Sequence, residues 1–162
     1  MNGNTVEAKM PEEDALVAEG KVDLVIRVQN MFLDREIRID LGKNIVTNSG
    51  LRMTLSRLRD TTYNPLSHLA VGTGGTAENA GNTALAQEKT RKAATITIDT
   101  SRFKLIATAS FSANEINGCQ EAGLFNASTG GTLFARKVFD SAISVPEGFT
   151  AELRYEISLA RA

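Results

Sequence analysis

Residues 149–159 read FTAELRYEISL, and their apolar side chains fall on every second position. Because successive side chains of a strand point to opposite faces, this period predicts a strand with one buried and one hydrated face. Residues 132–139, followed by the turn residues Pro146, Glu147 and Gly148, predict another strand before it. No catalytic constellation accompanies these two strands. The end of the chain therefore predicts a β-rich building block.

The same alternation recurs through most of the chain. It predicts further strands at residues 21–29, 36–41, 69–71, 94–99, 103–111 and 121–125. In residues 103–111, one face of the strand is expected to carry Phe103, Leu105, Ala107, Ala109 and Phe111. About eight closely spaced strands predict a mainly β fold, an antiparallel β-sandwich of jelly-roll type or an open barrel. Residues 21–162 are expected to form this single domain.

One short α-helix is predicted near residues 48–59. Thr47 or Asn48 can accept the first free backbone amides, and Leu51, Leu55 and Leu58 recur at helical spacing. Residues 83–92 contain good helix formers but a single clear core candidate, so their structure stays open.

Residues 1–20 are predicted to form a flexible acidic N-terminal arm, because this stretch has too few apolar residues to bury. Leu16 and Val17 are isolated in polar sequence, and we expect them to dock on a neighbouring subunit. Met31, Phe32 and Leu33 lie in a predicted hairpin connection. They either continue a strand into the core or form an exposed contact patch.

Composition argues against several classes of protein. The chain has 162 residues, a net charge of −1 and one cysteine, Cys119. A balanced charge gives no general field for nucleic acid, and a single thiol permits no internal disulfide. An intermolecular disulfide remains open, although a structural thiol is the simpler interpretation. No apolar run approaches a membrane span and no secretory signal is recognised, so synthesis in the cytoplasm is expected.

Motifs that suggest chemistry are weak. Residues 72–76 are rich in glycine but lack the lysine and the helix that a phosphate-binding loop needs, so an ordinary turn is favoured. His68 is the single histidine and has no metal-ligand spacing around it. Glu115 and Glu121 resemble a glycosidase pair only by their proximity, and solvated or salt-bridged glutamates are commoner. Glu88 and Arg91 can pair on a helical turn or anchor the loop to the sheet.

Three arginines, Arg52, Arg57 and Arg59, lie on the predicted helix. The ordinary interpretation is a solvated face, and an ion pair between subunits is equally compatible. Contact with nucleic acid is the weaker alternative.

Several segments, in this order, resemble bacteriophage virion proteins: Ile45-Val46-Thr47-Asn48-Ser49-Gly50-Leu51, His68-Leu69-Ala70-Val71-Gly72-Thr73-Gly74, Asn82-Thr83-Ala84-Leu85-Ala86-Gln87-Glu88, Glu121-Ala122-Gly123-Leu124-Phe125-Asn126 and Gly131-Thr132-Leu133-Phe134-Ala135-Arg136. Phage tail-fibre and related structural proteins carry such a series. The resemblance covers residues 44–159, and leaves out the strands at residues 21–41 and the acidic arm.

The resemblance implies a non-enzymatic structural subunit of the virion, a tail or tail-fibre component made in the cytoplasm of the host bacterium. It implies a homo-oligomer, with a trimer among the open symmetries, that docks on other virion proteins. It supplies no catalytic, cofactor-binding or metal-binding residues. No cofactor, small-molecule substrate, membrane or direct nucleic-acid partner is expected.

Two alternatives remain open at this stage. One is a capsid decoration protein on the phage head, with the N-terminal arm reaching across a subunit boundary. The other is a module that recognises a host receptor or glycan through the loop at residues 72–83. The absence of Trp argues modestly against sugars.

Overall fold

The computed structural model describes residues 16–30 and 33–161, and these form nine strands and two helices. The strands are β1 (Leu16–Asn30), β2 (Leu33–Val46), β3 (His68–Gly72), β4 (Glu88–Ala93), β5 (Thr95–Asp99), β6 (Lys104–Ser112), β7 (Glu121–Phe125), β8 (Leu133–Val138) and β9 (Thr150–Arg161). The helices are α1 (Asn48–Arg59) and α2 (Ala113–Ile116).

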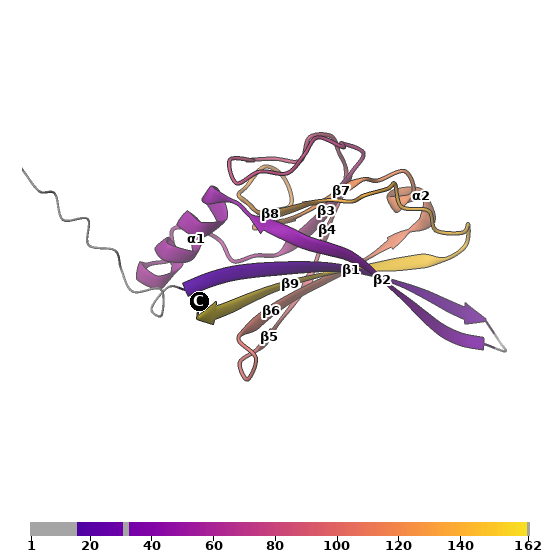
Figure 1. Cartoon of the computed structure of the whole chain (residues 1–162), viewed down its shortest axis with the longest axis horizontal. Coiled ribbons are helices and arrows are strands. Elements are labelled where there is room, and N and C mark those ends of the chain that lie inside the picture. Colours follow the sequence, from indigo (N-terminus) through magenta and orange to yellow (C-terminus); the bar gives the residue numbers. More distant parts are fainter. Residues whose placement is uncertain (1–15, 31–32, 162) are drawn as a thin grey trace, which may run out of the picture.

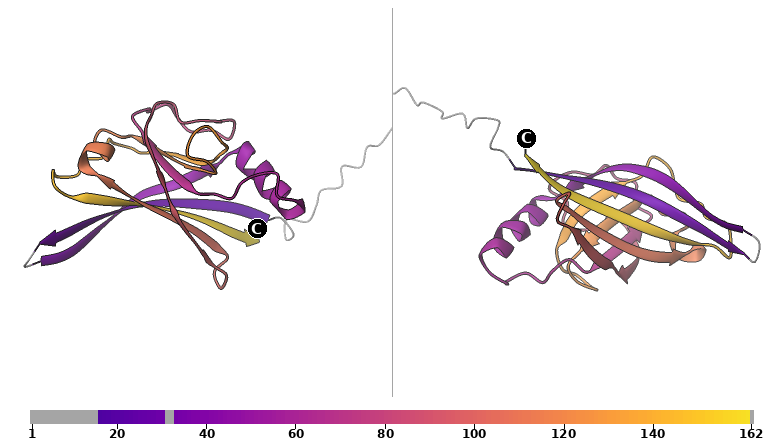
Figure 2. Two further views of the ribbon diagram at one scale, coloured as in Figure 1. Left: turned by 180° about the vertical axis from the view of Figure 1, so that it is seen from behind. Right: turned by 90° about the horizontal axis from the view of Figure 1, so that it is seen from below.

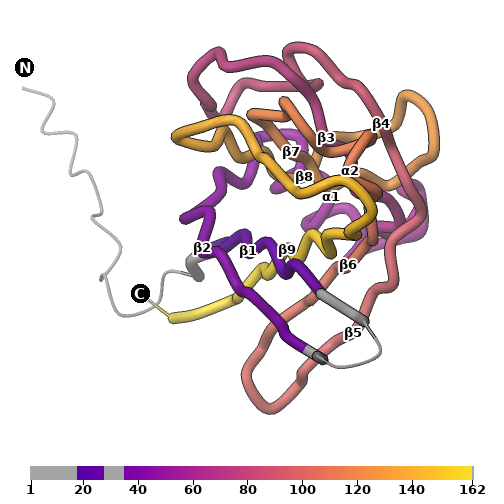
Figure 3. The backbone as a smooth tube through the Cα atoms, turned by 90° about the vertical axis from the view of Figure 1, so that its right-hand side faces the viewer, coloured from indigo at the N-terminus to yellow at the C-terminus, as the bar shows by residue number. Residues whose placement is uncertain are grey.

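All the strands belong to one antiparallel sheet that curls into a nearly closed barrel. Their order is β4-β3-β7-β8-β2-β1-β9-β6-β5. Strands β4 and β5 stand at opposite ends of this order, yet only Ala94 separates them along the chain. The amide of Ala94 donates to the carbonyl of Ser67 at 2.8 Å, which holds the corner where the two ends meet. The predicted antiparallel β fold is confirmed in its open-barrel form (Figures 1 and 3).

The core lies between two curved layers, β3, β7 and β8 on one side and β1, β9 and β6 on the other (Figure 1). On β9 the buried positions are Ala151, Leu153, Tyr155 and Ile157, which is the alternation that the sequence predicts. The Tyr155 hydroxyl donates to the carbonyl of Ala122 on β7 at 2.8 Å, so one side chain bridges the layers. Burial of this phenol raises its pKa well above the ordinary value.

Strand β1 begins at Leu16, five residues before the predicted start at Lys21. Residues 16–20 pair with β9, from Leu16 opposite Arg161 to Gly20 opposite Ile157. Of the predicted N-terminal arm, therefore, residues 16–20 are part of the sheet, and residues 1–15 lie outside the described residues.

The predicted helix is confirmed as α1, but the leucines that recur at helical spacing do not form its packed face. Thr47 is the N-cap and accepts from the Gly50 amide at 3.0 Å. The buried residues of α1 are Gly50 and Met53, whereas Leu51, Leu55 and Leu58 are 44%, 68% and 81% exposed. Gly50 lies so close to β8 that a Cβ there would be 2.3 Å from the Phe134 carbonyl oxygen, so this approach requires a glycine. The face of α1 that packs on the sheet is therefore the one that carries Gly50, where the two backbones approach closely, and not the one that carries the leucines.

Two other local predictions need correction. Phe103 has a positive φ of 52° and is 69% exposed, because it lies in the turn between β5 and β6 and not on the inner face of β6. The ambiguous segment at residues 83–92 ends in strand β4, and α2 is a short helix that the sequence analysis did not predict.

Strands β1 and β2 form a long hairpin whose distal part extends past the other strands (Figures 1 and 2). They pair from Gly20 opposite Asn44 to Asn30 opposite Leu33. On its other edge, β2 pairs with β8 only at Ile45 and Val46. In the described part of the chain, the edge of β2 at residues 33–44 therefore has no neighbouring strand.

Candidate functional site

The glycine-rich segment opens a loop, residues 73–87, that covers the outer face of β3, β7 and β8. Leu85 of this loop forms a small buried cluster with Ala70, Phe125 and Leu133. Gly123 lies beneath it, and a Cβ there would come within 2.9 Å of Leu85 and 2.8 Å of Leu133. The glycine leaves the space that the Leu85 side chain needs.

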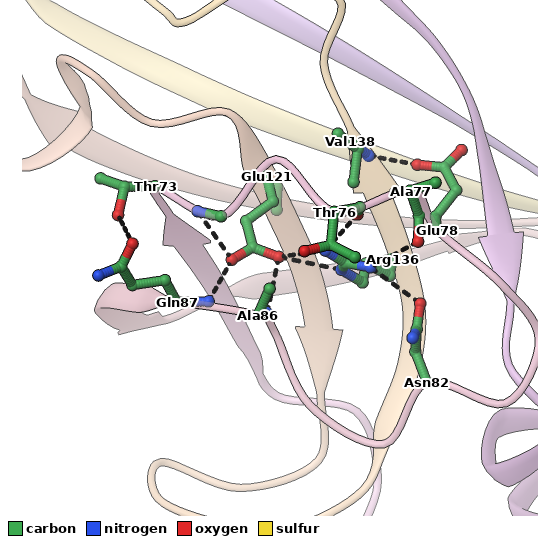
Figure 4. A network of polar contacts seen from close by, with 12 residues as sticks. Thr73, Thr76, Ala77, Glu78, Asn82, Ala86, Gln87, Glu121, Arg136 and Val138 are labelled. Atoms are coloured by element: carbon green, nitrogen blue, oxygen red, sulfur yellow. Dashed lines mark hydrogen bonds and ion pairs between the residues drawn. The ribbon is translucent and has the colours of Figure 1, made fainter.

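Polar contacts hold this loop through Glu121, the first residue of β7 (Figure 4). Its carboxylate accepts from the backbone amides of Gly74 at 3.2 Å, Ala86 at 3.0 Å and Gln87 at 2.7 Å. These amides come from both ends of the loop. One buried carboxylate thus draws the two ends together, in the way that charged acceptors form strong hydrogen bonds with amides.

Arg136 on β8 completes the arrangement (Figure 4). Its Nε donates to Glu121 Oε2 at 2.9 Å, and the Nη2–Oε2 distance is 2.8 Å. The remaining guanidinium N–H groups donate to the carbonyls of Thr76 and Ala77 and to Asn82 Oδ1, at 2.9, 3.4 and 2.9 Å. Every N–H of the guanidinium has an acceptor, so burial leaves none unpaired.

The ion pair is closed to solvent, with side chains 1% exposed for Arg136 and 0% for Glu121. A charge taken from water is tolerated only with a partner and further hydrogen bonds, and both are present here. Since no part of either group reaches the surface, the pair positions the loop and offers no functional group to a substrate.

Two glycines of this segment, Gly72 and Gly74, leave space for this carboxylate and for the backbone of Gln87. A Cβ at Gly72 or Gly74 would lie 2.8 or 2.5 Å from Glu121 Oε1. The loop amides face an anion, as in a phosphate-binding loop, but the anion is a side chain of the protein itself. The structure therefore agrees with the sequence analysis in giving the segment a structural role.

The far end of the loop is held separately. Glu78 accepts from the Val138 amide and lies 3.4 Å from Lys137 Nζ, and the Asn48 amide of α1 donates to Ala80 at 2.8 Å. Exposed residues remain between these attachment points: Gly75, Thr76, Ala77, Asn79, Ala80, Gly81, Thr83 and Ala84. The loop is a firmly attached surface feature.

The other chemical candidates lie apart from this network. Ser67 Oγ is 2.8 Å from His68 Nδ1, and Cys119 is buried with its thiol near the Glu115 carbonyl at 3.6 Å. Burial raises the pKa of the Cys119 thiol, which lowers its reactivity. Glu115 and Glu121 form no pair: Glu115 caps α2 and bonds to Lys92 at 2.7 Å, whereas Glu121 bonds to Arg136.

The predicted pairing of Glu88 with Arg91 is confirmed at 2.6 Å, in strand β4 and not on a helix. Arg91 also lies 3.6 Å over the Phe125 ring and donates to the carbonyls of Ala127 and Gly130. It anchors the turn after β7 to the sheet.

The predicted interface residues fall into separate regions. Leu16 and Val17 lie in β1, opposite Arg161 and Ala160, and Leu33 begins β2. Met31 and Phe32 lie outside the described residues.

The three predicted arginines are exposed on α1. Arg59 pairs with Asp60 at 2.7 Å, and Arg57 donates to the Tyr63 carbonyl at 3.0 Å. Both of these contacts are with residues that directly follow α1.

A second feature of the surface is an apolar groove of about 590 Å³, between α1 and the ends of β5, β6 and β9. Its lining includes Met53, Arg57, Leu58, Ile98, Phe103, Lys104, Ile157 and Leu159. Ile98 and Phe103 are each 69% exposed. The groove was not predicted from the sequence, where Leu58 belongs to a helical leucine repeat and Phe103 to the apolar face of a strand pattern.

Within residues 16–30 and 33–161, no three acidic, histidine or cysteine side chains converge as a metal site. No helix in that part of the chain has the length and apolarity to cross a membrane. Comparison with protein-family models finds no match, and neither does comparison with curated proteins or with solved structures.

Proposed function

We propose that this chain is a non-enzymatic structural subunit of a bacteriophage particle, a tail or fibre component that self-associates and docks on other virion proteins. The proposed virion role is supported by the sequence segments that resemble phage structural proteins and occur in the same order along the chain. The observation that carries the self-association is the unpaired edge of β2 on the projecting hairpin (Figure 2).

The β2 edge is long, and its exposed residues 35–40 comprise two isoleucines and four charged residues. Residues 33–44 correspond to about 40 Å of strand at the usual rise per residue. All residues from 35 to 40 are exposed, and Ile37 and Ile39 are 50% and 40% exposed. Such an edge presents unpaired amides and carbonyls beside apolar side chains, which favours the addition of another strand.

The edge of β4 differs in this respect. Lys89 Nζ donates to the carbonyls of Asn114 and Asn117 at 2.9 and 3.0 Å, and Lys92 Nζ bonds to Glu115 at 2.7 Å. Side chains of β4 therefore contact α2 and the residue that follows it. Lysines on edge strands are a common means of preventing strand addition. The contrast favours β2 over β4 as the edge that a second copy would pair with.

Self-association is tested by sedimentation equilibrium of the full chain. We expect a concentration-dependent increase in mass, and we expect the double variant Ile37→Lys/Ile39→Lys to remain monomeric, because charges replace the apolar side chains of the edge. The matched control is Leu55→Lys, which changes a 68% exposed leucine on α1 and should associate as the original chain does. A monomer at all concentrations would refute the proposed self-association.

The location is tested by labelling intact phage particles with an antibody against the chain. Label on the tail or its fibres supports the proposal. Label on the head instead supports the capsid decoration alternative, and particles without the protein would contradict a virion role.

A further inference from the structure

We propose that the apolar groove between α1 and the ends of β5, β6 and β9 binds residues 1–15 of the same chain. The inference concerns an intramolecular contact and is independent of the proposed assembly through β2.

The groove is too apolar to be an ordinary hydrated surface. Leu58, Ile98 and Phe103 are 81%, 69% and 69% exposed, and Leu159 at its end is 40% exposed. Isolated exposed apolar residues are normal, but several that line one groove indicate a binding surface.

The charge of the groove selects among possible occupants. Among the residues that the structure describes, Arg57 and Lys104 are the charged residues that line the groove, and none of its lining residues carries a carboxylate. Lys104 is paired with Glu156 at 2.9 Å, whereas Arg57 donates to the carbonyl of Tyr63. Helix α1 carries three arginines and no acidic residue. Two such grooves facing each other would bring like charges together, so a second copy of this face is a poor occupant.

Residues 1–15 have the complementary composition. They contain four carboxylates, at Glu7, Glu12, Glu13 and Asp14, against the single Lys9. Their larger apolar side chains are Val6 and Met10, apart from the initial Met1. An acidic segment that carries a few apolar side chains matches an apolar groove beside an arginine helix.

The attachment point of this segment is close to the groove. In the β1–β9 register, Leu16 lies opposite Arg161 and Ala18 lies opposite Leu159. The segment therefore joins the sheet two positions from a residue that lines the groove, or about 7 Å along the strand. Met10 is six residues from Leu16 and can reach about 20 Å. Phe103 is close to this attachment point, because the Leu159 amide donates to the Phe103 carbonyl at 3.0 Å.

A short tether also favours binding within one chain. Tethered segments have effective local concentrations of the order of millimolar, so even weak complementarity fills the groove.

The test measures binding of a fluorescent peptide, residues 1–15, to the full chain and to a chain that starts at Leu16. We expect the shortened chain to bind the peptide, at least about tenfold tighter than the full chain does, because the full chain already occupies its groove. Raising the salt concentration should weaken binding, because part of the attraction is between opposite charges.

Variants of the shortened chain locate the contact. Leu58→Asp should weaken peptide binding by about tenfold or more, since it places a carboxylate in the groove. The matched control is Leu55→Asp, on the same helix but outside the groove lining, which should bind as the unaltered shortened chain does. Circular dichroism of each variant checks that the fold is retained.

Three results would overturn the inference: no binding by the shortened chain, equal binding by the full chain, or equal loss in the Leu55 and Leu58 variants. Sedimentation separates this outcome from the proposed assembly. If removing residues 1–15 dissociates an oligomer that Ile37→Lys/Ile39→Lys leaves intact, the segment occupies a neighbour's groove, and the intramolecular contact is wrong.

Discussion

At the residue scale, Glu121 and Arg136 determine how the loop at residues 73–87 is held. The carboxylate accepts from amides at both ends of the loop, and the guanidinium donates to carbonyls between them. Both side chains are needed, because each forms hydrogen bonds with backbone groups of the loop that would otherwise lack a partner within the protein. The loop owes its position to this pair and to Leu85.

Replacing Arg136 with Leu should lower the free energy of unfolding by about 3–5 kcal/mol, since Glu121 would remain buried without its partner. The measurement is urea unfolding monitored by circular dichroism. Arg59→Leu is the control, because Arg59 is 80% exposed in its pair with Asp60 and should change stability by less than about 1 kcal/mol. Equal effects of the two substitutions would show that the buried pair has no special role.

Gly123→Ala should destabilise the chain by about 1–3 kcal/mol, because its Cβ has to displace Leu85, Phe125 and Leu133. Adding Leu85→Ala should cost less in this background than in the original chain, since the same space is contested. Gly75→Ala is the control, because its nearest contact is the flexible Gln120 side chain at 3.3 Å. Additive effects of Gly123→Ala and Leu85→Ala would refute the shared space.

The ion pair could have been suspected from the sequence, because each of its charged residues stands beside a run of apolar residues, a feature that an analysis of periodicity does not consider. Glu121 stands in a strand whose five residues are all buried, and Arg136 follows three buried residues of β8. A charge within an apolar run indicates a partner, but only the register of β7 with β8 identifies it. Gly123 lies opposite Arg136 in that register, so the partner is two positions along the strand.

At the element scale, α1 is attached through Thr47. The Thr47 hydroxyl accepts from the Gly50 amide and donates to the Leu133 carbonyl at 2.6 Å. It therefore caps the helix and joins it to β8 at the same time. The Thr47 amide also donates to the Phe134 carbonyl at 2.9 Å, and Met53 of the helix packs into the core.

Thr47→Val should lower the free energy of unfolding by about 1–3 kcal/mol, because the cap is lost and a buried carbonyl loses its donor. Thermal unfolding by calorimetry measures the change. The same substitution at the exposed Thr61 is the control and should have an effect below about 0.5 kcal/mol. A Thr47 effect as small as that of Thr61 would contradict the role of the cap.

The short helix α2 introduces a pH dependence. The Lys92 ammonium and the Ser112 amide hold the pKa of Glu115 below its ordinary value of 4.5. A carboxyl group with a lowered folded pKa stabilises the fold above its unfolded pKa, and this contribution disappears as the pH falls through the folded pKa.

We therefore expect Glu115→Gln to be less stable than the original chain at pH 7, with the difference shrinking as the pH falls below about 4.5. Urea unfolding over this pH range provides the measurement. Glu147→Gln, at an exposed turn, should differ little from the original chain at any pH. A Glu115 difference that grows in acid would show that the sign is wrong.

Strands were predictable from sequence where one face alone is buried, as in β9, where every second residue packs inward. The inner face of α1 was not predictable in this way, because the helix packs through the close approach of Gly50 to Phe134 and not through its leucines. The prediction for Phe103 was wrong because this apolar residue lies in a turn and not in the strand that its spacing suggests. Leucine and phenylalanine at these positions line a groove, and composition cannot distinguish such a surface from a core.

At the scale of the whole molecule, the barrel is closed at one side and open at another. Ala94 joins the ends of the sheet at β4 and β5, whereas β2 meets β8 at two positions only. The hairpin of β1 and β2 therefore carries a long edge beyond the barrel, and the proposed assembly depends on this edge.

Amide hydrogen exchange at low and high protein concentration tests that proposal most directly. Strand addition gives partners to amides that otherwise face water, so their exchange should slow. We predict slower exchange at high concentration in peptides that cover residues 33–44, with no change in β4 or in the Ile37→Lys/Ile39→Lys variant. Protection that increases elsewhere while residues 33–44 exchange equally fast would contradict assembly through β2.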